Sequence, residues 1–330
     1  MNITKNQIDE LNVELTLQVS NEDYAEIERK KLAERRRTAE FKGFRKGMVP
    51  ASMIKKVYGD QCLVDAVNEV VSKALDDHIS ESGMHLLGEP ITGKNQPEID
   101  WVSGNEFTFV FDCGLSPEFE FDVEKADTVQ QYNVTVSDKE KEPMLENLKK
   151  YYEGKEEAKT DEQLLEEVGQ RLEAEYKQEA EWRLTKDIKD FFIQKSGVKL
   201  PEDFLKRWLF VANNGKVSKE DIEKEFDGFA LDFKWQLVRG YLLKKFEFNL
   251  DEKDLMEAAT SFVRYQYAMY GMNDVPEDMV SEAVKNILQD QKQVDRLAEQ
   301  VEDTKVIAKL KETITIKSKK ISAEKFRELK

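Results

Sequence analysis

The sequence predicts an α+β N-terminal domain with a small antiparallel sheet, followed by a mainly α-helical C-terminal domain. Apolar and polar residues alternate along Leu11–Val19 and again along Phe107–Phe111. This period of two predicts two half-buried strands, which we expect to pair. From Gln163 onward, apolar residues recur at helical spacing between N-capping motifs and short connections, which predicts antiparallel neighbouring helices. The expected domain boundaries are 1–112, 113–162 and 163–330.

The helices of the N-terminal domain have recognisable start and stop signals. Ser20 or Asn21 can cap a helix that runs to about Arg37 or Ala39. After a loop, we expect a short helix from Pro50 to Tyr58, which Gly59 ends, and a longer helix over 61–82.

The middle of the chain is expected to hold a linker over Leu115–Val123, a strand over Val129–Val136, a helix over Ser137–Tyr152 and a charged loop over Glu153–Glu162. The helices expected after this loop are Gln163–Ser196, Glu202–Asn213, Val217–Phe226, Leu231–Phe246, Asp251–Tyr270, Pro276–Gln289 and Asp290–Lys311. The tail has an alternating piece at Ile314 and Ile316, then a short helix.

Charge is distributed unevenly along the 330 residues. The chain has a net charge of -16. Between Arg29 and Lys56, however, eleven Lys and Arg residues stand against only Glu34 and Glu40. A solvated helix face would explain a mixture of charges better than this excess of cations. We therefore expect one region to meet a polyanion.

Other chemistry has little support in the sequence. Cys62 and Cys113 have neither metal-ligand spacing nor a disulfide framework, and His78 and His85 are the only histidines. The Gly-rich phosphate loop of nucleotide-binding proteins is absent. We expect no metal and no cofactor. The N-terminus lacks a signal-peptide pattern, and no apolar run approaches the roughly 20 residues of a membrane span. We expect a cytoplasmic protein that does not associate with membranes.

The segment Phe41–Pro50, within the basic region, has the composition of a tight loop. Gly43 and Gly47 bracket a three-residue tip of one aromatic residue and two cations. Glycine tolerates backbone angles that other residues avoid, so both sides of the loop can turn tightly. An exposed aromatic residue beside cations indicates a partner, although an ordinary solvated basic turn has the same composition.

This segment, with a strand and a basic helix before it, closely resembles the ribosome-docking signature of bacterial trigger factor. The order of N-terminal elements and the C-terminal helices also resemble that family over most of the chain. The resemblance implies a ribosome-binding N-terminal domain and an arm-forming C-terminal chaperone domain. The implied ribosome-binding residues are Gly43, Phe44, Arg45, Lys46, Gly47 and Pro50, flanked by Arg36, Arg37 and Lys42.

One departure from the family concerns a domain inside the chain. The family normally carries a peptidyl-prolyl isomerase domain that resembles FK506-binding proteins, inserted after a strand and a helix like Val129–Tyr152. Here about ten polar residues lead from Tyr152 to the helix at Gln163, whereas such a domain needs roughly 100 residues. Isomerase activity is therefore not transferred, and we expect a protein that is not an enzyme.

A Met- and aromatic-rich cluster in the C-terminal half has two interpretations. Its members are Phe262, Tyr265, Met269, Tyr270 and Met272. Such residues suit a surface that accepts many sequences, which would make them substrate-binding residues. The same residue types at helical spacing are more often part of a core.

By resemblance, the function is that of an ATP-independent chaperone. It would dock at the exit tunnel of the large ribosomal subunit, through ribosomal protein and rRNA, and hold unfolded nascent polypeptides. For the protein away from the ribosome, a monomer and a homodimer both stay open. Two alternatives stay open: an RNA-binding or ribosome-assembly factor that uses the basic helix and loop, and a holdase that acts away from the ribosome.

Overall fold

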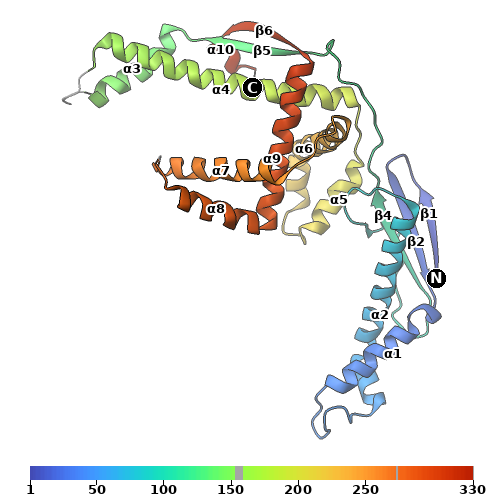
Figure 1. Cartoon of the computed structure of the whole chain (residues 1–330). Helices are drawn as coiled ribbons and strands as arrows, with labels where there is room; N and C mark the ends of the chain where they lie inside the picture. The colour runs from blue at the N-terminus through green and yellow to red at the C-terminus, as the bar shows by residue number, and fades with distance from the viewer. Residues whose placement is uncertain (153–158, 273, 330) are drawn as a thin grey trace. The chain divides into compact units, whose positions relative to one another are not determined.

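The computed structural model describes residues 1–152, 159–272 and 274–329 (Figure 1). These residues form two compact units: 1–118 with 199–230, and 119–198 with 231–330. Residues 199–230, which the sequence placed among the C-terminal helices, therefore belong to the same unit as the N-terminal sheet. The loop expected over 153–162 lies largely outside the described residues.

The first unit contains a four-stranded antiparallel sheet. Its strands are β1 (Asn2–Gln7), β2 (Asn12–Val19), β3 (Ile91–Thr92) and β4 (Phe107–Gly114), in the order β1-β2-β4-β3. The predicted pairing of the two alternating segments is confirmed, with Leu15 opposite Phe111. One face of β2 is fully buried, as the period of two requires. Strand β1 was not predicted, because its polar sequence has no alternation.

Two antiparallel helices, α1 (Asn21–Thr38) and α2 (Ala51–Ser82), lie between β2 and β3 in the chain and are linked by the basic loop. Buried Tyr24 links α1 to the segment just before β4. Its hydroxyl donates to the Asn105 carbonyl at 2.9 Å and accepts from the Gly104 amide at 2.8 Å. The predicted break of α2 at Gly59 was wrong. One helical glycine costs only about 1 kcal/mol relative to alanine, and Gly59 is buried within a continuous helix.

Helix α5 (Glu202–Ala212) packs against β4 in the same unit. A Cβ atom on Gly114 would lie 2.5 Å from Cδ1 of Phe204, so the strand can approach the ring only without a side chain. Arg207 adds hydrogen bonds to Asp112 and to the carbonyl of Thr92. Helix α6 (Lys219–Lys245) runs without the interruption that the sequence predicted over 227–230.

The second unit is mainly helical. Its elements are a parallel pair of strands, β5 (Thr128–Thr135) and β6 (Thr315–Ser322), with α3 (Asp138–Tyr152), α4 (Asp161–Ser196), α7 (Glu252–Met269), α8 (Glu277–Gln289), α9 (Gln291–Thr313), α10 (Ala323–Arg327) and the end of α6. The fold class predicted from the sequence is thus confirmed.

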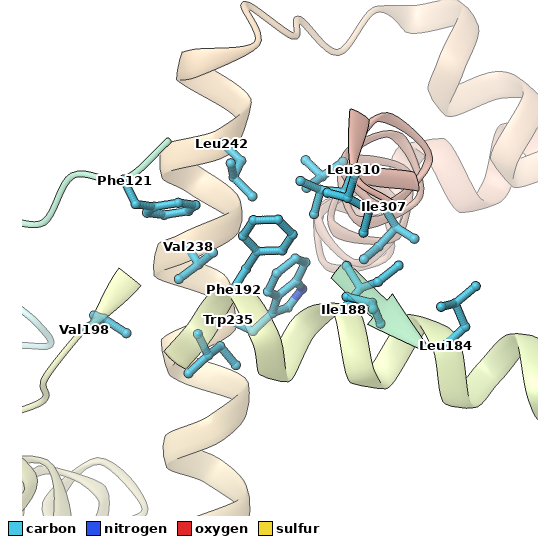
Figure 2. Close-up of a cluster of buried hydrophobic side chains, with 14 residues drawn as sticks. Phe121, Leu184, Ile188, Phe192, Val198, Trp235, Val238, Leu242, Ile307 and Leu310 are labelled. Carbon is cyan, nitrogen blue, oxygen red and sulfur yellow. The ribbon is translucent and has the colours of Figure 1, made fainter. Parts of the chain in front are cut away.

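The main core of the second unit joins α4, the end of α6 and α9 (Figure 2). Phe192, Val238 and Leu310, one from each helix, have no exposed surface. Trp235 lies at the edge of this core, where its Nε1 donates to Asp303 at 2.6 Å. A buried indole keeps a polar partner in this way.

A smaller core joins α7, α8 and α9 within the second unit. Its buried members are Ala259, Val263, Val280, Val284, Ile287 and Leu297. A hydrogen bond from Lys305 to Asp254 ties α9 to α7 and holds the pKa of this carboxyl below its ordinary value. The opposite face of α7 is left to solvent.

Candidate functional site

The loop between α1 and α2 consists of two successive β-turns. The amide of Phe44 donates to the carbonyl of Phe41 at 3.0 Å, and the amide of Met48 donates to that of Arg45 at 2.9 Å. Gly43 and Gly47 occupy the third position of each turn, with φ of 92° and 83°. Type II turns need a positive φ at this position, so the spacing of the two glycines shapes the loop.

A separate small core supports the base of the loop. Val49 and Ile54 are 0% and 1% exposed, and they pack with Ala39 and with the half-buried rings of Phe41 and Tyr58. The two rings meet edge to face, with centroids 6.2 Å apart. Apolar contacts of this kind hold both ends of a short loop in place without using the residues at its tip.

Arg36 and Arg37 differ in the contacts that they make. The Nε atom of Arg36 donates to the carbonyl oxygen of Val49 at 2.8 Å, which links α1 to the far end of the loop. Arg37 is exposed. Among the described residues, no ion pair involves Arg37. The sequence prediction gave both residues one role, whereas this geometry gives Arg36 a positioning role.

The tip of the loop presents one aromatic ring and two cations to solvent. The ring of Phe44 is 41% exposed. Arg45 is exposed and forms no ion pair with any described residue, whereas Nζ of Lys46 lies 3.5 Å from Oε1 of Glu40. Exposed pairs of this length contribute little, so both cations remain able to meet an anionic partner. Exposed Lys42 lies in the first turn.

Three further apolar side chains are exposed near the loop, and the sequence prediction missed them. Met48, Met53 and Val57 are 69%, 38% and 59% exposed. Met53 and Val57 are four residues apart on α2 and therefore share a helix face. This spacing was present in the sequence within the helix predicted over Pro50–Tyr58, but spacing alone does not show whether a helix face is buried or exposed. Pro50 is also exposed and stands directly before α2.

The five predicted substrate-binding residues are all exposed. Phe262, Tyr265, Met269, Tyr270 and Met272 show 38%, 65%, 70%, 85% and 45% of their surface. The interpretation of this cluster as part of a core is therefore wrong. Phe262, Tyr265 and Met269 are spaced three and four residues apart, which places them on one side of α7. We call these five residues the α7 patch.

Both thiols are buried, and their environments raise their pKa values. Burial raises the pKa of Cys113 to about 12, and the neighbouring Asp112 carboxylate adds to this. Burial also raises the pKa of Cys62. A nucleophilic cysteine needs a lowered pKa, so neither residue has the environment of a catalytic thiol.

The described residues hold neither a candidate metal site nor a candidate membrane span. No group of three or more His, Cys, Asp or Glu side chains could hold a metal ion in that part of the chain. No helix there combines the length and apolar character that a bilayer crossing requires.

Family models match the chain over two ranges. Residues 1–148 match the family model described as "Bacterial trigger factor protein (TF)". Residues 180–330 match the one described as "Probable trigger factor, C-terminal domain". Both halves of the chain therefore match models of one family.

The chain belongs to the trigger factor family. A trigger factor of Francisella tularensis subsp. novicida is 28% identical over 152 residues, which are 46% of this chain and 34% of the relative. A trigger factor of a Nitratiruptor species is 32% identical over 152 residues, 45% of this chain and 33% of the relative. The alignments thus span about a third of these curated relatives.

A solved structure of the trigger factor chaperone, from work on promiscuous substrate recognition in its folding and assembly activities, has the same fold. It matches with a TM-score of 0.54 and 14% identity, over 94% of this chain and 99% of that chain. Between the two matched ranges lie only residues 149–179, with the end of α3 and the start of α4. An inserted isomerase domain of roughly 100 residues does not fit there.

Proposed function

We propose that this trigger factor is a nucleotide-independent chaperone that docks beside the exit tunnel of the large ribosomal subunit and holds unfolded nascent chains. Docking in the cytoplasm would place it where nascent chains emerge. The observation that carries the proposal is the tip of the α1–α2 loop, where an exposed Phe44 ring stands beside Arg45, a cation without an ion-pair partner among the described residues.

The loop has the chemistry of an anchor for a ribosomal surface. Arg45 and Lys46 would meet rRNA phosphates or an acidic side chain of a ribosomal protein, because guanidinium and ammonium groups pair with such anions. Phe44 would fill a small apolar recess. Met48 and Val57 extend the apolar part of this surface, and Arg37 and Lys42 add longer-range attraction that salt screens.

The α7 patch is the proposed surface for unfolded chains. Two Met and two Tyr side chains with more than a third of their surface exposed offer polarizable, adaptable contacts to many sequences. Such contacts bind weakly one at a time, so a held segment can leave and fold without a nucleotide cycle. An aggregation-suppression assay with a chemically denatured client tests this role. We expect slower aggregation with the intact chain, and no effect would reject the holding function.

We propose no isomerase activity for this chain. In an assay with a proline-containing peptide, cis-trans exchange should proceed at the uncatalysed rate, with a time constant on the order of tens of seconds at 25 °C. Substantial turnover would reject this part of the proposal.

A second candidate, an RNA-binding or ribosome-assembly factor, has support from the basic end of α1, where Arg35, Arg36 and Arg37 follow one another. The two functions differ in the target that is bound most tightly. An RNA-binding factor would bind naked rRNA with an affinity that falls steeply as salt rises. We expect the chaperone to bind intact ribosomes more tightly than naked rRNA at the same salt concentration, because Phe44 needs an apolar recess.

A further inference from the structure

The two strands of the small sheet in the second unit differ in how their edges are protected. Strand β6 carries Lys317, Lys319 and Lys320, all exposed. Charged side chains, lysine above all, protect natural sheet edges from pairing with other chains. Strand β5 has no charged residue between Thr128 and Thr135.

The outer edge of β5 borders a groove. Its volume is about 840 Å³, and its β5 wall is Gln131–Val134. The other wall comes from α4, and no residue of β6 lines the groove. Because β5 and α4 line the hollow and β6 does not, the hollow lies on the side of β5 away from β6.

Backbone groups on this edge have no pairing partner within the described chain. Strand β5 pairs with β6 in parallel from Thr128 to Thr135, and no backbone hydrogen bond joins it to another described element. In a parallel pair, alternate residues direct their N–H and C=O groups to the partner, and the rest direct them outward. The outward groups need hydrogen bonds, which water or another strand can supply.

The opposite wall offers contacts for side chains. The indole of Trp182 lines the groove and is 64% exposed. Tyr132 lines it from β5, where its ring also packs against Phe326 at 6.0 Å between centroids. The α4 wall also carries the exposed side chains of Glu173 and Lys177, whose opposite charges offset each other. The carboxylate of Glu181 is paired with Lys311, so the wall has no net charge.

We propose that the outer edge of β5 binds an extended, uncharged segment of an unfolded polypeptide as a third strand, whose side chains pack against Trp182. The inference rests on the proposed chaperone function but names a surface distinct from the α7 patch. The neutral edge selects an uncharged segment, and the outward backbone groups select an extended one. The four β5 residues along the groove span about 13 Å, which matches a segment of about four to six residues.

The test uses fluorescence anisotropy with the intact chain and a fluorescein-labelled peptide of alternating Val and Thr. A second peptide with the same side chains is N-methylated at two adjacent residues, so that both of its edges lose a donor. We expect this peptide to bind about tenfold more weakly. Trp182→Ala should also weaken binding of the first peptide several-fold. Leu165→Ala, which alters another exposed apolar residue of α4, should not.

Each other outcome overturns the proposal in a distinguishable way. One outcome is that N-methylation and Trp182→Ala have no effect, while a Tyr265→Ala/Met269→Ala variant loses binding. In that case the chaperone function stands, and the proposal that the β5 edge binds the peptide is wrong. If neither the peptide nor a denatured client binds, the proposed function fails as well. If Trp182→Ala dissociates a dimer of this chain in sedimentation experiments, a second copy is the occupant and the peptide proposal is overturned.

Discussion

The Nε atom of Arg36 donates a hydrogen bond to the carbonyl oxygen of Val49 at 2.8 Å, so the last turn of α1 holds the far end of the basic loop. This contact needs the geometry of a guanidinium and not only its charge. Lysine has no donor at the Nε position. The contact therefore separates a positioning role from an electrostatic one.

We predict that Arg36→Lys weakens ribosome binding almost as much as Arg36→Ala does. A hydrogen bond worth about 1 kcal/mol corresponds to about a fivefold loss of affinity. Arg37→Lys, which keeps the charge of an exposed residue, should change affinity little. Hydrogen exchange at the Met48 amide gives a second measurement, because only the Arg36 variants should accelerate it. Equal behaviour of Arg36→Lys and Arg37→Lys would contradict the positioning role.

The two turn glycines give a second prediction. At Gly43 and Gly47 nothing lies within 4 Å of an added Cβ, so alanine is disfavoured only by the positive φ. Each Gly→Ala change should destabilise the turn conformation of the loop by about 1 kcal/mol. Docking should therefore weaken. Gly59→Ala is the matched control within α2, where alanine should stabilise by about 0.5–1 kcal/mol. Urea unfolding and ribosome binding, measured for all three variants, test this. If Gly47→Ala stabilised the protein, this would contradict the positive φ assigned to residue 47 in the turn.

The exposed α7 patch makes a third prediction. Tyr265→Ala/Met269→Ala should change the free energy of unfolding by no more than about 0.5 kcal/mol per site, and should reduce aggregation suppression. Leu297→Ala, in the small core beneath α7, should instead cost about 2–4 kcal/mol. Thermal unfolding and client aggregation separate the two effects. A large loss of stability in the double variant would place these side chains in a core.

Thiol chemistry supplies a pH-dependent prediction. The reactive species is the thiolate, and a thiol with a pKa of about 12 (Cys113) is only about one part in ten thousand thiolate at pH 8. Its modification by an aromatic disulfide reagent should be slow in the native state, rise about tenfold per pH unit and become fast after unfolding in urea. Cys62, whose pKa burial also raises, should behave similarly. Rapid native labelling at pH 8 would contradict the burial.

The sequence predicted those elements whose pattern follows from local chemistry. Alternation identified β2 and β4, and their pairing followed from the need to cover one apolar face. Glycine was misread at Gly59 because the same residue can end a helix or pack within one, and only the neighbouring helix decides. The parallel pairing of Thr128 with Thr315 joins residues far apart in the chain, which no local pattern records.

The sequence was enough to predict which residues form the candidate site, but not which of them bind and which position the loop. The spacing of Gly43 and Gly47 indicated the loop, whereas the separate role of Arg36 depends on where Val49 lies in space. Likewise, the periodicity around Tyr265 is the same for a buried face and an exposed one. Only the packing of the other side of α7 against α8 and α9 shows that this face is left to solvent.

The central claim is that the loop tip docks on the ribosome, and co-sedimentation tests it most directly. The intact chain is compared with a Phe44/Arg45/Lys46→Ala variant whose fold is first verified by circular dichroism. We predict that the intact chain pellets with 70S ribosomes and that the variant stays in the supernatant. If both pellet equally, the contact lies elsewhere on the basic helix. If neither pellets, docking is wrong and a holdase that acts away from the ribosome remains.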